Sequence, residues 1–318
     1  MSLSKVLYVD VPFEGEKGGD KNRSQFLWKT LCNHYDVDLL LLLGDEYRTR
    51  PIKRDKNDRI VHSLVIRSAN LFNPRAIHYF HQYQIEKFKK VLKETRYDLV
   101  FFRFLSCFEL ASIAHQVLPN ARIAIDVDML FSRISELSWK EDRSIHNRYH
   151  LFEMIKLRRY ELMAFRSDFL FFFTNSIERD LAVKRYGLHV DNALVNPNMM
   201  PATKDIQESV KPPVERFILF FGSLDSVANI DAFEYLKSQI YSSIETELMN
   251  HDCYILVVGK GKLKLHENHN CSRMIVVGEV DDMASYIALS QFVILPLRIA
   301  SGTRTRILES ASQAKAVI

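Results

Sequence analysis

The sequence predicts an α/β protein built from two parallel-sheet, doubly wound domains in tandem. Near-continuous apolar runs alternate with longer amphipathic stretches along most of the chain, which is typical of parallel strands covered by helices on both faces. A proline-rich, polar stretch without a period interrupts this alternation at residues 197–216. With 318 residues, the chain has room for two domains of about 150 residues each. We therefore expect one domain at residues 1–197, a linker at 198–215 and a second domain at 216–318.

The first domain is expected to alternate strands with helices from its first residues onward. The apolar runs predict strands at residues 5–11, 37–43, 98–104, 122–127, 168–174 and 193–195. The amphipathic stretches between several of them predict helices at residues 24–34, 77–95, 107–118, 151–166 and 177–186. Strands that are separated by helices pair in parallel, so the loops after the strands gather at one edge of the sheet.

The same alternation restarts after the linker. The apolar runs of the second domain predict strands at residues 216–222, 253–259, 273–278 and 292–296. Helices are expected at residues 229–249, 282–289 and 303–313. No internal repeat or low-complexity segment competes with this organisation.

The composition indicates a globular protein in a reducing compartment. The formal net charge is +4 and hydrophobic residues make up 47% of the chain, as in soluble globular proteins. No nucleic-acid partner is expected. The four cysteines are scattered without a CxxC pair, and they are interpreted as small buried apolar residues. No signal-peptide pattern precedes the first expected strand, and the apolar runs are too short to span a bilayer. We therefore expect a cytoplasmic protein without a bound metal.

A basic run, YRTRPIKRDKNDR, occupies residues 47–59. Its simpler interpretation is a solvated loop. The alternative is a surface for an anionic partner such as phospholipid. In that case the protein would act peripherally at the inner face of the membrane, and its acceptor would be lipid-linked.

The loops after the strands of the second domain carry glycine or charged residues. They are FFGSLDS (220–226), VVGKGKL (257–263), VVGEVDD (276–282) and LPLRIASGTR (295–304). Glycine lets the backbone approach a ligand closely, and the last loop opens a helix, whose N-terminus attracts anions. Any one loop is more simply explained as a turn. Four such loops, each directly after a predicted strand, together indicate a site for a nucleotide diphosphate.

Charged side chains near the last loop fit the same ligand. Arg298, Arg304 and Arg306 offer fork-shaped donors that match phosphate oxygens. Glu309 lies further into the expected helix, and its carboxylate can accept hydrogen bonds from a sugar diol.

The segments from Gly222 onward resemble the donor half of retaining, nucleotide-sugar-dependent glycosyltransferases of the GT-B fold, family 4 type. The family consensus there reads G-x-V-x-D…Y…A-x-x-x-V-x-P…G-x-G-T-R-x-K-I-L-E-A-M-A-x-G-x-P-V-V, and the match covers residues 216–318 in order and spacing. The N-terminal half resembles the acceptor domain of that family more loosely, through FEGEKGGDKNR (13–23), YDLVFFRF, RIAIDVDMLFS and LVNPNM. The resemblance implies two Rossmann-like domains, the first for the acceptor and the second for the donor.

The resemblance also implies roles for individual residues. Glu309 corresponds to the glutamate that holds the nucleotide ribose, Gly302, Thr303 and Arg304 lie at the diphosphate, and Glu279 and Val280 lie beside the base. The donor site is expected to include Gly222, Ser223, Gly259, Arg298 and Ser301 as well. On the acceptor side the corresponding residues are Gly18, Gly19 and Arg103, with Asp128 as the catalytic residue beside the acceptor hydroxyl.

Two departures from the family pattern affect the donor site. Ser301 stands where the family has the first glutamate of its E-x7-E motif, eight residues before Glu309. The usual arginine and lysine after the first glycine loop are also absent, because Ser223, Ala228 and Asn229 stand there. Charge neutralisation is then expected to fall mainly on Arg298 and Arg304.

Asp126 and Asp128 spell D-x-D, a pattern that binds a divalent metal in a different glycosyltransferase fold. The donor motif lies in the other domain, so we interpret this pair as not binding metal.

Three functions are compatible with these patterns. The first is a metal-independent, retaining glycosyltransferase that uses a nucleotide diphosphate sugar as substrate, needs no cofactor, and serves surface polysaccharide or glycolipid synthesis. The second is a non-catalytic binding or scaffold protein of the same shape. The third, ranked last, is a sugar-nucleotide epimerase.

The final segment, AKAVI at residues 314–318, predicts a strand entering the sheet. Parallel α/β domains cover such a strand with a further helix, and the resembling family continues with more strands and helices. We therefore expect the second domain to be incomplete, lacking the end of the donor domain.

Overall fold

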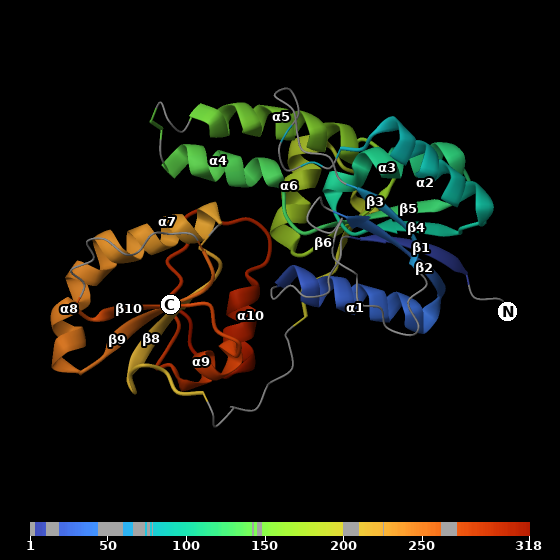
Figure 1. Cartoon of the computed structure of the whole chain (residues 1–318). Coiled ribbons are helices and arrows are strands. Elements are labelled where there is room, and N and C mark those ends of the chain that lie inside the picture. The colour runs from blue at the N-terminus through green and yellow to red at the C-terminus, as the bar shows by residue number, and fades with distance from the viewer. Residues whose placement is uncertain are drawn as a thin grey trace. The chain divides into compact units, whose positions relative to one another are not determined.

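The computed structural model describes residues 4–10, 19–43, 60–65, 74, 77, 79–141, 143–144, 148–199, 210–224, 226–261 and 272–318. The chain divides into two compact units (Figure 1). Unit 1 comprises Met1–Asn198 together with Ser301–Thr303, and unit 2 comprises Met199–Ala300 and Arg304–Ile318. Gly18, the basic run and residues 200–209 of the expected linker lie outside the described residues.

Unit 1 is built on a parallel sheet with the strand order β3-β2-β1-β4-β5-β6-β7. The strands are β1 (Lys5–Asp10), β2 (Asp36–Leu43), β3 (Ile60–Val65), β4 (Leu99–Phe102), β5 (Arg122–Val127), β6 (Leu170–Phe173) and β7 (Ala193–Val195). The order reverses its direction between β1 and β4, which makes this point the topological switch where ligands bind in doubly wound sheets.

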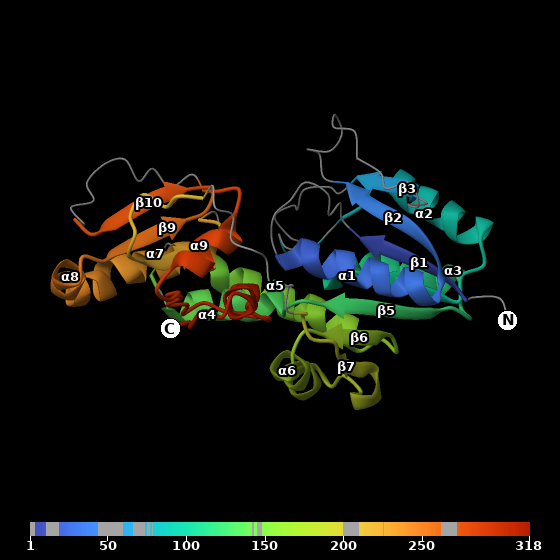
Figure 2. The same ribbon diagram turned by 90° about the horizontal axis from the view of Figure 1, so that it is seen from below.

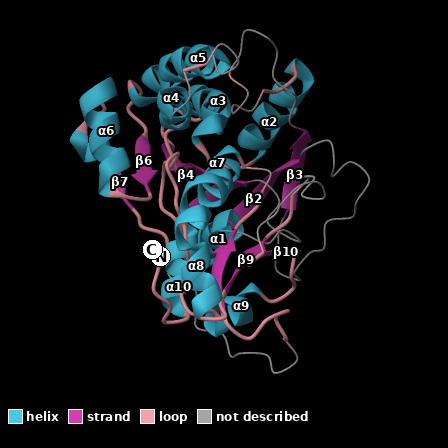
Figure 3. Cartoon of the chain, turned by 90° about the vertical axis from the view of Figure 1, so that its left-hand side faces the viewer, coloured by secondary structure: helices cyan, strands magenta, loops and turns pink. Residues whose placement is uncertain are grey.

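Helices cover both faces of this sheet. On one face lies α1 (Gly19–His34), whose Leu27 and Leu31 share a core with Tyr8 and Phe101 (Figure 2). The other face forms a larger core with α2 (Gln82–Glu94), α3 (Phe108–Val117), α5 (Arg148–Phe165) and α6 (Ser176–Tyr186). Helix α4 (Phe131–Glu141) lies beside α5 (Figure 3).

Unit 2 has a parallel sheet in the order β10-β9-β8. Its strands are β8 (Phe217–Phe221), β9 (Tyr254–Val258) and β10 (Met274–Gly278). Between β8 and β9, α7 (Val227–Tyr235) runs through a π-helical turn at Leu236–Ile240 into α8 (Tyr241–Asn250), and these helices cover one face. Helix α9 (Met283–Leu289) covers the other face, and α10 (Thr305–Ser312) follows the glycine-containing last loop.

The parallel α/β class predicted from the alternation is confirmed by the described strands, but three elements differ from expectation. Strand β3 and helix α4 were not predicted. In α4 the most buried positions are Ser132, Ser135 and Ser138, so its closest packing is made by small polar residues rather than by the apolar ones. Residues 292–296 form no extended strand in the described chain. Val293 alone bridges to Leu219 and Val317.

The cysteine prediction holds for only part of the set. Cys107 and Cys253 are buried, whereas Cys32 is exposed on α1. Cys271 lies outside the described residues.

Candidate functional site

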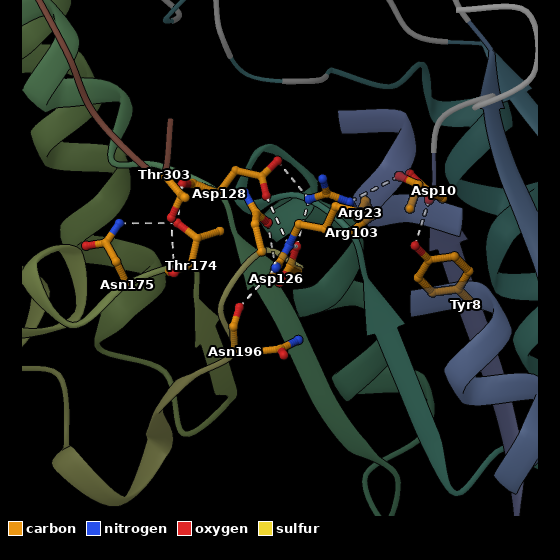
Figure 4. Close-up of polar contacts among 12 residues, drawn as sticks. Tyr8, Asp10, Arg23, Arg103, Asp126, Asp128, Thr174, Asn175, Asn196 and Thr303 are labelled. Carbon is orange, nitrogen blue, oxygen red and sulfur yellow. Dashed lines mark hydrogen bonds and ion pairs between the residues drawn. The ribbon is translucent and has the colours of Figure 1, made fainter. Parts of the chain in front are cut away.

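In unit 1, charged side chains collect at the carboxyl ends of the strands next to the switch point. Asp10 ends β1, Arg103 follows β4 directly, and Asp126 and Asp128 lie at the end of β5. Arg23 reaches the same place from α1. Figure 4 shows these five side chains in one cluster. The local reason is the parallel register, which brings the ends of β1, β4 and β5 to the same edge.

Two arginines bind the D-x-D carboxylates in this cluster. Arg103 Nη1 lies 2.7 Å from Asp126 Oδ2 and 2.8 Å from Asp128 Oδ2. Arg23 Nε donates to Asp126 Oδ2 at 2.8 Å, and its Nη2 pairs with the other oxygen of that carboxylate. Arg103 and Asp126 have no exposed surface. Because buried charges are stable only when they are paired, these contacts explain how the cluster can exist inside the sheet edge.

The remaining bonds of the two arginines tie the cluster to its surroundings. Arg23 Nη1 donates to the Asn196 carbonyl and to Asn198 Oδ1, both at 2.9 Å. Arg103 Nε donates to Ser24 Oγ at 3.1 Å. Within the described part of the chain, Arg103 Nη2 is buried and has no hydrogen-bond partner. That nitrogen is a donor that a bound hydroxyl could satisfy.

Burial and charge set the protonation of the cluster. Burial acts against the charge of Arg103, but Asp128 and Asp126 outweigh it and raise the pKa of the guanidinium above its ordinary value. At the neighbouring strand end, Tyr8 Oη donates to Asp10 Oδ2 at 2.7 Å. Burial, followed by the charge of Asp10, raises the pKa of Tyr8 well above its ordinary value. The tyrosine therefore remains a neutral donor at physiological pH.

Residues 301–303 of the expected diphosphate loop pack within unit 1. Ser301 Oγ and the Gly302 amide donate to Glu178 Oε1 at 2.9 and 3.1 Å, and Thr303 Oγ1 donates to the Thr174 carbonyl at 3.1 Å (Figure 4). Gly302 has a φ of 73°, and a Cβ there would come within 2.5 Å of the Asp128 carbonyl oxygen. Only glycine fits this close approach.

Glu178 is a site residue that the sequence did not single out. It is buried, and besides the loop it accepts a hydrogen bond from the Leu130 amide at 3.0 Å. The available signal was its position three residues after Asn175, which caps α6 by accepting from the Glu178 amide at 2.9 Å. A capping pattern predicts a helix start but not the further partners of the carboxylate.

In unit 2, two glycines bring the loops after neighbouring strands into contact. Gly222 follows β8 and Gly259 follows β9, with φ values of 145° and 155°. A Cβ on Gly259 would lie 1.9 Å from the Gly222 carbonyl oxygen. The Gly259 amide also donates to the Gly278 carbonyl at the end of β10, at 2.8 Å. The three strand ends therefore form one surface of closely packed backbone, as a phosphate-binding site requires.

Arg306 joins helix α10 to this surface. Its Nη1 donates to the Phe221 carbonyl and its Nη2 to Asn229 Oδ1, both at 2.7 Å. The Asn229 amide in turn donates to the Ser223 carbonyl at 2.6 Å. Burial, then the nearby Arg304, lowers the pKa of Arg306 to about 10. Arg306 thus supplies a cation beside the first glycine loop, where the sequence lacks the arginine and lysine of the glycosyltransferases that it resembles.

The other predicted donor residues of unit 2 are only partly brought together. Arg304 is the N-cap of α10, and Glu309 lies on the same helix three residues after Arg306, on the same side. Glu279 and Val280 follow β10 directly. Arg298, in contrast, pairs with Asp231 on α7 and lies over the Tyr235 ring, 4.7 Å from its centroid. A diphosphate would therefore have to compete with Asp231 for the guanidinium of Arg298.

The acceptor-side predictions are also placed unevenly. Arg103 and Asp128 are in contact within the cluster of unit 1. Gly19 is the first residue of α1, and Gly18 lies outside the described residues. Among the described residues, no group of three or more His, Cys, Asp or Glu side chains is arranged to hold a metal ion. Within that same part of the chain, no helix has both the length and the apolar character needed to cross a membrane.

Comparison with known proteins adds a family match for part of the chain. Residues 215–318 match the family model described as Glycosyl transferases group 1. No curated protein sequence matches the chain.

Solved structures match nearly the whole chain at low sequence identity. HepE from Anabaena in complex with UDP is 13% identical, with a TM-score of 0.57, over 98% of this chain and 79% of that protein. A glycosyltransferase from Rickettsia africae gives the same identity and TM-score over 100% of this chain and 79% of its own. The lipopolysaccharide outer core galactosyltransferase WaaB is 13% identical, with a TM-score of 0.54, over 98% of this chain and 79% of that one. These similarities show that the chain has the GT-B fold of two Rossmann-like units.

Proposed function

We infer that the chain is a glycosyltransferase that moves a sugar from a nucleotide diphosphate donor to a hydroxyl acceptor. The observation that carries the inference is the surface of unit 2 formed by Gly222, Gly259 and the start of α10, which lies within the segment that matches Glycosyl transferases group 1. Structures of HepE were solved with UDP and with UDP-glucose, which supports a uridine nucleotide as the first ligand to test. We further propose retention of configuration, as in family 4 enzymes.

The donor would bind to unit 2 through backbone and arginine donors. Arg304 and the amides at the start of α10 would contact the diphosphate, while Glu309 would accept from the ribose hydroxyls. Glu279 and Val280 would present backbone to the base. Arg306 would hold the first glycine loop in place through Phe221 and Asn229.

The reaction breaks the bond between the sugar carbon and the diphosphate oxygen and forms a bond from the same carbon to the acceptor oxygen. The leaving diphosphate gains negative charge, and arginines together with a helix N-terminus stabilise such charge. With that stabilisation from protein groups, we propose a reaction that needs no metal or other cofactor. The acceptor hydroxyl would bind in unit 1 beside Asp128, with the buried Nη2 of Arg103 as a further donor. Its proton would pass to an oxygen of the leaving diphosphate as the new bond forms.

The acceptor and the location follow as further proposals. We propose that the product belongs to surface polysaccharide or glycolipid synthesis and that the protein works in the cytoplasm. A lipid-linked acceptor would bring it to the inner face of the membrane.

Nucleotide binding tests the donor site directly. Isothermal titration calorimetry with UDP and GDP is expected to show binding of at least one of them, weakened about tenfold or more by Arg304→Ala or Glu309→Ala because each removes a charge-assisted hydrogen bond. Matched controls are Arg216→Ala and Glu215→Ala, two exposed residues just before β8, at the opposite end of the strand; they should bind as the wild type does. If neither nucleotide binds, the proposal fails.

A non-catalytic GT-B protein is the second candidate, and one contact favours it. Ser301 occupies the position of the family's first glutamate, and its hydroxyl is already bonded to Glu178. Incubation with a labelled nucleotide sugar and a panel of hydroxyl acceptors separates the two functions. Nucleotide binding without release or transfer of sugar would identify a binding protein, and a new sugar nucleotide formed without acceptor would identify an epimerase.

A further inference from the structure

Helix α5 of unit 1 carries three large apolar side chains that are exposed. Phe152, Ile155 and Met163 expose 63%, 56% and 57% of their surface. Phe152 and Ile155 are three residues apart, and Met163 follows Ile155 by about two helical turns. The three side chains therefore lie on one side of the helix. From Phe152 to Met163 they span about 16 Å of the helix axis, which is more than a single side-chain contact.

The exposed charges in the apolar row of α5 are all positive. Arg148 and Arg159 are exposed and fall at positions that continue the apolar row. Both acids of the helix are turned inward: Glu153 is buried beside Lys156, and Glu161 is fully buried and accepts from Ser132. The outward side therefore combines apolar side chains with cations and carries no exposed carboxylate.

The inward side of α5 explains why this arrangement is stable. Leu157, Ala164 and Phe165 are buried, and α4 packs along the helix (Figures 1 and 3). The apolar side chains of the outward row take no part in that core. Three large apolar residues exposed in one row form a patch of the kind that marks an interaction surface.

We propose that the outward side of α5, formed by Arg148, Phe152, Ile155, Arg159 and Met163 and called the α5 face below, binds the surface of an anionic membrane. Helices that lie in the membrane interface combine these two features, with apolar side chains entering the acyl boundary and Arg or Lys contacting the phosphates.

Charge complementarity favours a membrane over a second copy of the chain. A symmetric dimer through the α5 face would bring the same cations of two copies together, and like charges across an interface are unfavourable. Phosphatidylglycerol headgroups would neutralise Arg148 and Arg159 instead. The surface also differs from the basic run at residues 47–59, which has no apolar row of this kind in its sequence.

Vesicle co-sedimentation of the full chain tests the proposal and requires no nucleotide, so its outcome is independent of the proposed transferase activity. The wild type is expected to bind vesicles of phosphatidylcholine mixed with phosphatidylglycerol and to bind pure phosphatidylcholine far more weakly. The double variant Phe152→Ser, Ile155→Ser should weaken binding about tenfold or more, because two side chains no longer enter the bilayer. Arg148→Gln with Arg159→Gln should weaken it about tenfold or more and reduce its dependence on salt.

Controls keep a folding defect apart from a binding defect. Ile177→Ser and Tyr83→Ser replace apolar residues that are equally exposed, at 65% and 64%, on α6 and α2, and both should bind as the wild type does. Unchanged fluorescence of Trp28 and Trp139, which both belong to unit 1, would show that each variant is folded.

Four results would overturn the proposal. The first is equal binding to anionic and neutral vesicles, and the second is unchanged binding by the Phe152→Ser, Ile155→Ser variant. The third is that binding is lost only when Arg48, Arg50, Lys53 and Arg54 are neutralised. The fourth is that the wild type binds no vesicles and forms a dimer that dissociates in the Phe152→Ser, Ile155→Ser variant.

Discussion

Arg306 donates a hydrogen bond to the carbonyl oxygen of Phe221 at 2.7 Å, and this bond links the first turn of α10 to the last residue of β8. The two segments meet at the strand end where Gly222 begins the first glycine loop. Because its other nitrogen binds Asn229, a single side chain determines how far the helix start lies from the glycine loop. The proposed donor surface of unit 2 is therefore held in part by this cation.

We expect Arg306→Ala to weaken nucleotide binding about tenfold and to lower the stability of unit 2 by about 2–4 kcal/mol, since it leaves two buried acceptors without a donor. Arg306→Lys keeps the charge but cannot reproduce both bonds. Its nucleotide affinity and its unit 2 stability should therefore lie between those of the wild type and of Arg306→Ala. Differential scanning calorimetry measures the stability of unit 2. Tryptophan fluorescence would not report on this unit, because both tryptophans are in unit 1. Equal nucleotide affinity in all three proteins would contradict this role.

Gly259→Ala is expected to destabilise unit 2 much more than Gly278→Ala. Both residues have positive φ, 155° and 84°, so both substitutions strain the backbone by about 1–3 kcal/mol. Only at Gly259 does the new Cβ meet backbone, at 1.9 Å from the Gly222 oxygen, whereas nothing lies within 4 Å at Gly278. The unit 2 transition should fall at least about 10 °C further for Gly259→Ala. Similar transitions in calorimetry would mean that the loops do not touch.

Arg103→Met should destabilise unit 1 by about 3–5 kcal/mol, because Asp126 then lies in the protein interior with one of its cations removed. Arg103→Lys should restore little, since one ammonium cannot replace bonds made by separate nitrogens of the guanidinium. Urea unfolding followed by tryptophan fluorescence reports unit 1 selectively. In a double-mutant cycle with Asp126→Asn, effects that add to within about 0.5 kcal/mol would show that the two charges are not coupled.

The acid stability of unit 1 is expected to depend on Glu136. Burial would raise the pKa of this carboxyl, but hydrogen bonds from Lys140, Arg158 and Arg185 outweigh it and lower the pKa from 4.5 to about 2. A lowered folded-state pKa means that the carboxylate stabilises the folded protein above pH 4.5 and that this contribution is lost as the pH falls toward about 2.

Glu136→Gln should therefore be less stable than the wild type at neutral pH and equally stable near pH 2. Urea unfolding at a series of pH values measures the difference. Asp168→Asn, at an exposed position just before β6, is the control, and a gap between wild type and Glu136→Gln that stays constant with pH would rule out the ion-pair explanation.

The sequence was sufficient to predict the parallel α/β class because buried parallel strands are apolar at nearly every position. It was not sufficient for α4, where small serines occupy the buried positions and Ser132 bonds to Glu161. Its apolar residues Phe131, Ile134 and Leu137 are spaced as in a helix, but the burial of serines against α5 depends on a partner that is distant in the sequence.

At the site, the loops were predictable and the side-chain partners were not. Glycines after strands signal close backbone approach, and Gly222 and Gly259 do touch. Arg298 and Arg306 are both arginines near the same loop, and nothing in the sequence distinguishes the one that pairs with Asp231 from the one that reaches Phe221. Arg23 was missed for a similar reason, since its partner Asp126 is 103 positions away.

The bonds of Arg23 have a consequence for the order in which the chain can fold. This residue is near the start of unit 1, yet its guanidinium holds the Asn196 carbonyl and the Asn198 side chain, 173 and 175 positions later. Contacts of such separation form slowly, because the loop between them must close first. During synthesis, β1 and α1 leave the ribosome long before β7 does, so Arg23 lacks its partners Asn196 and Asn198 until the segment after β7 has emerged. In ribosome-bound chains that end before residue 196, Nη1 of Arg23 should therefore be without these two acceptors.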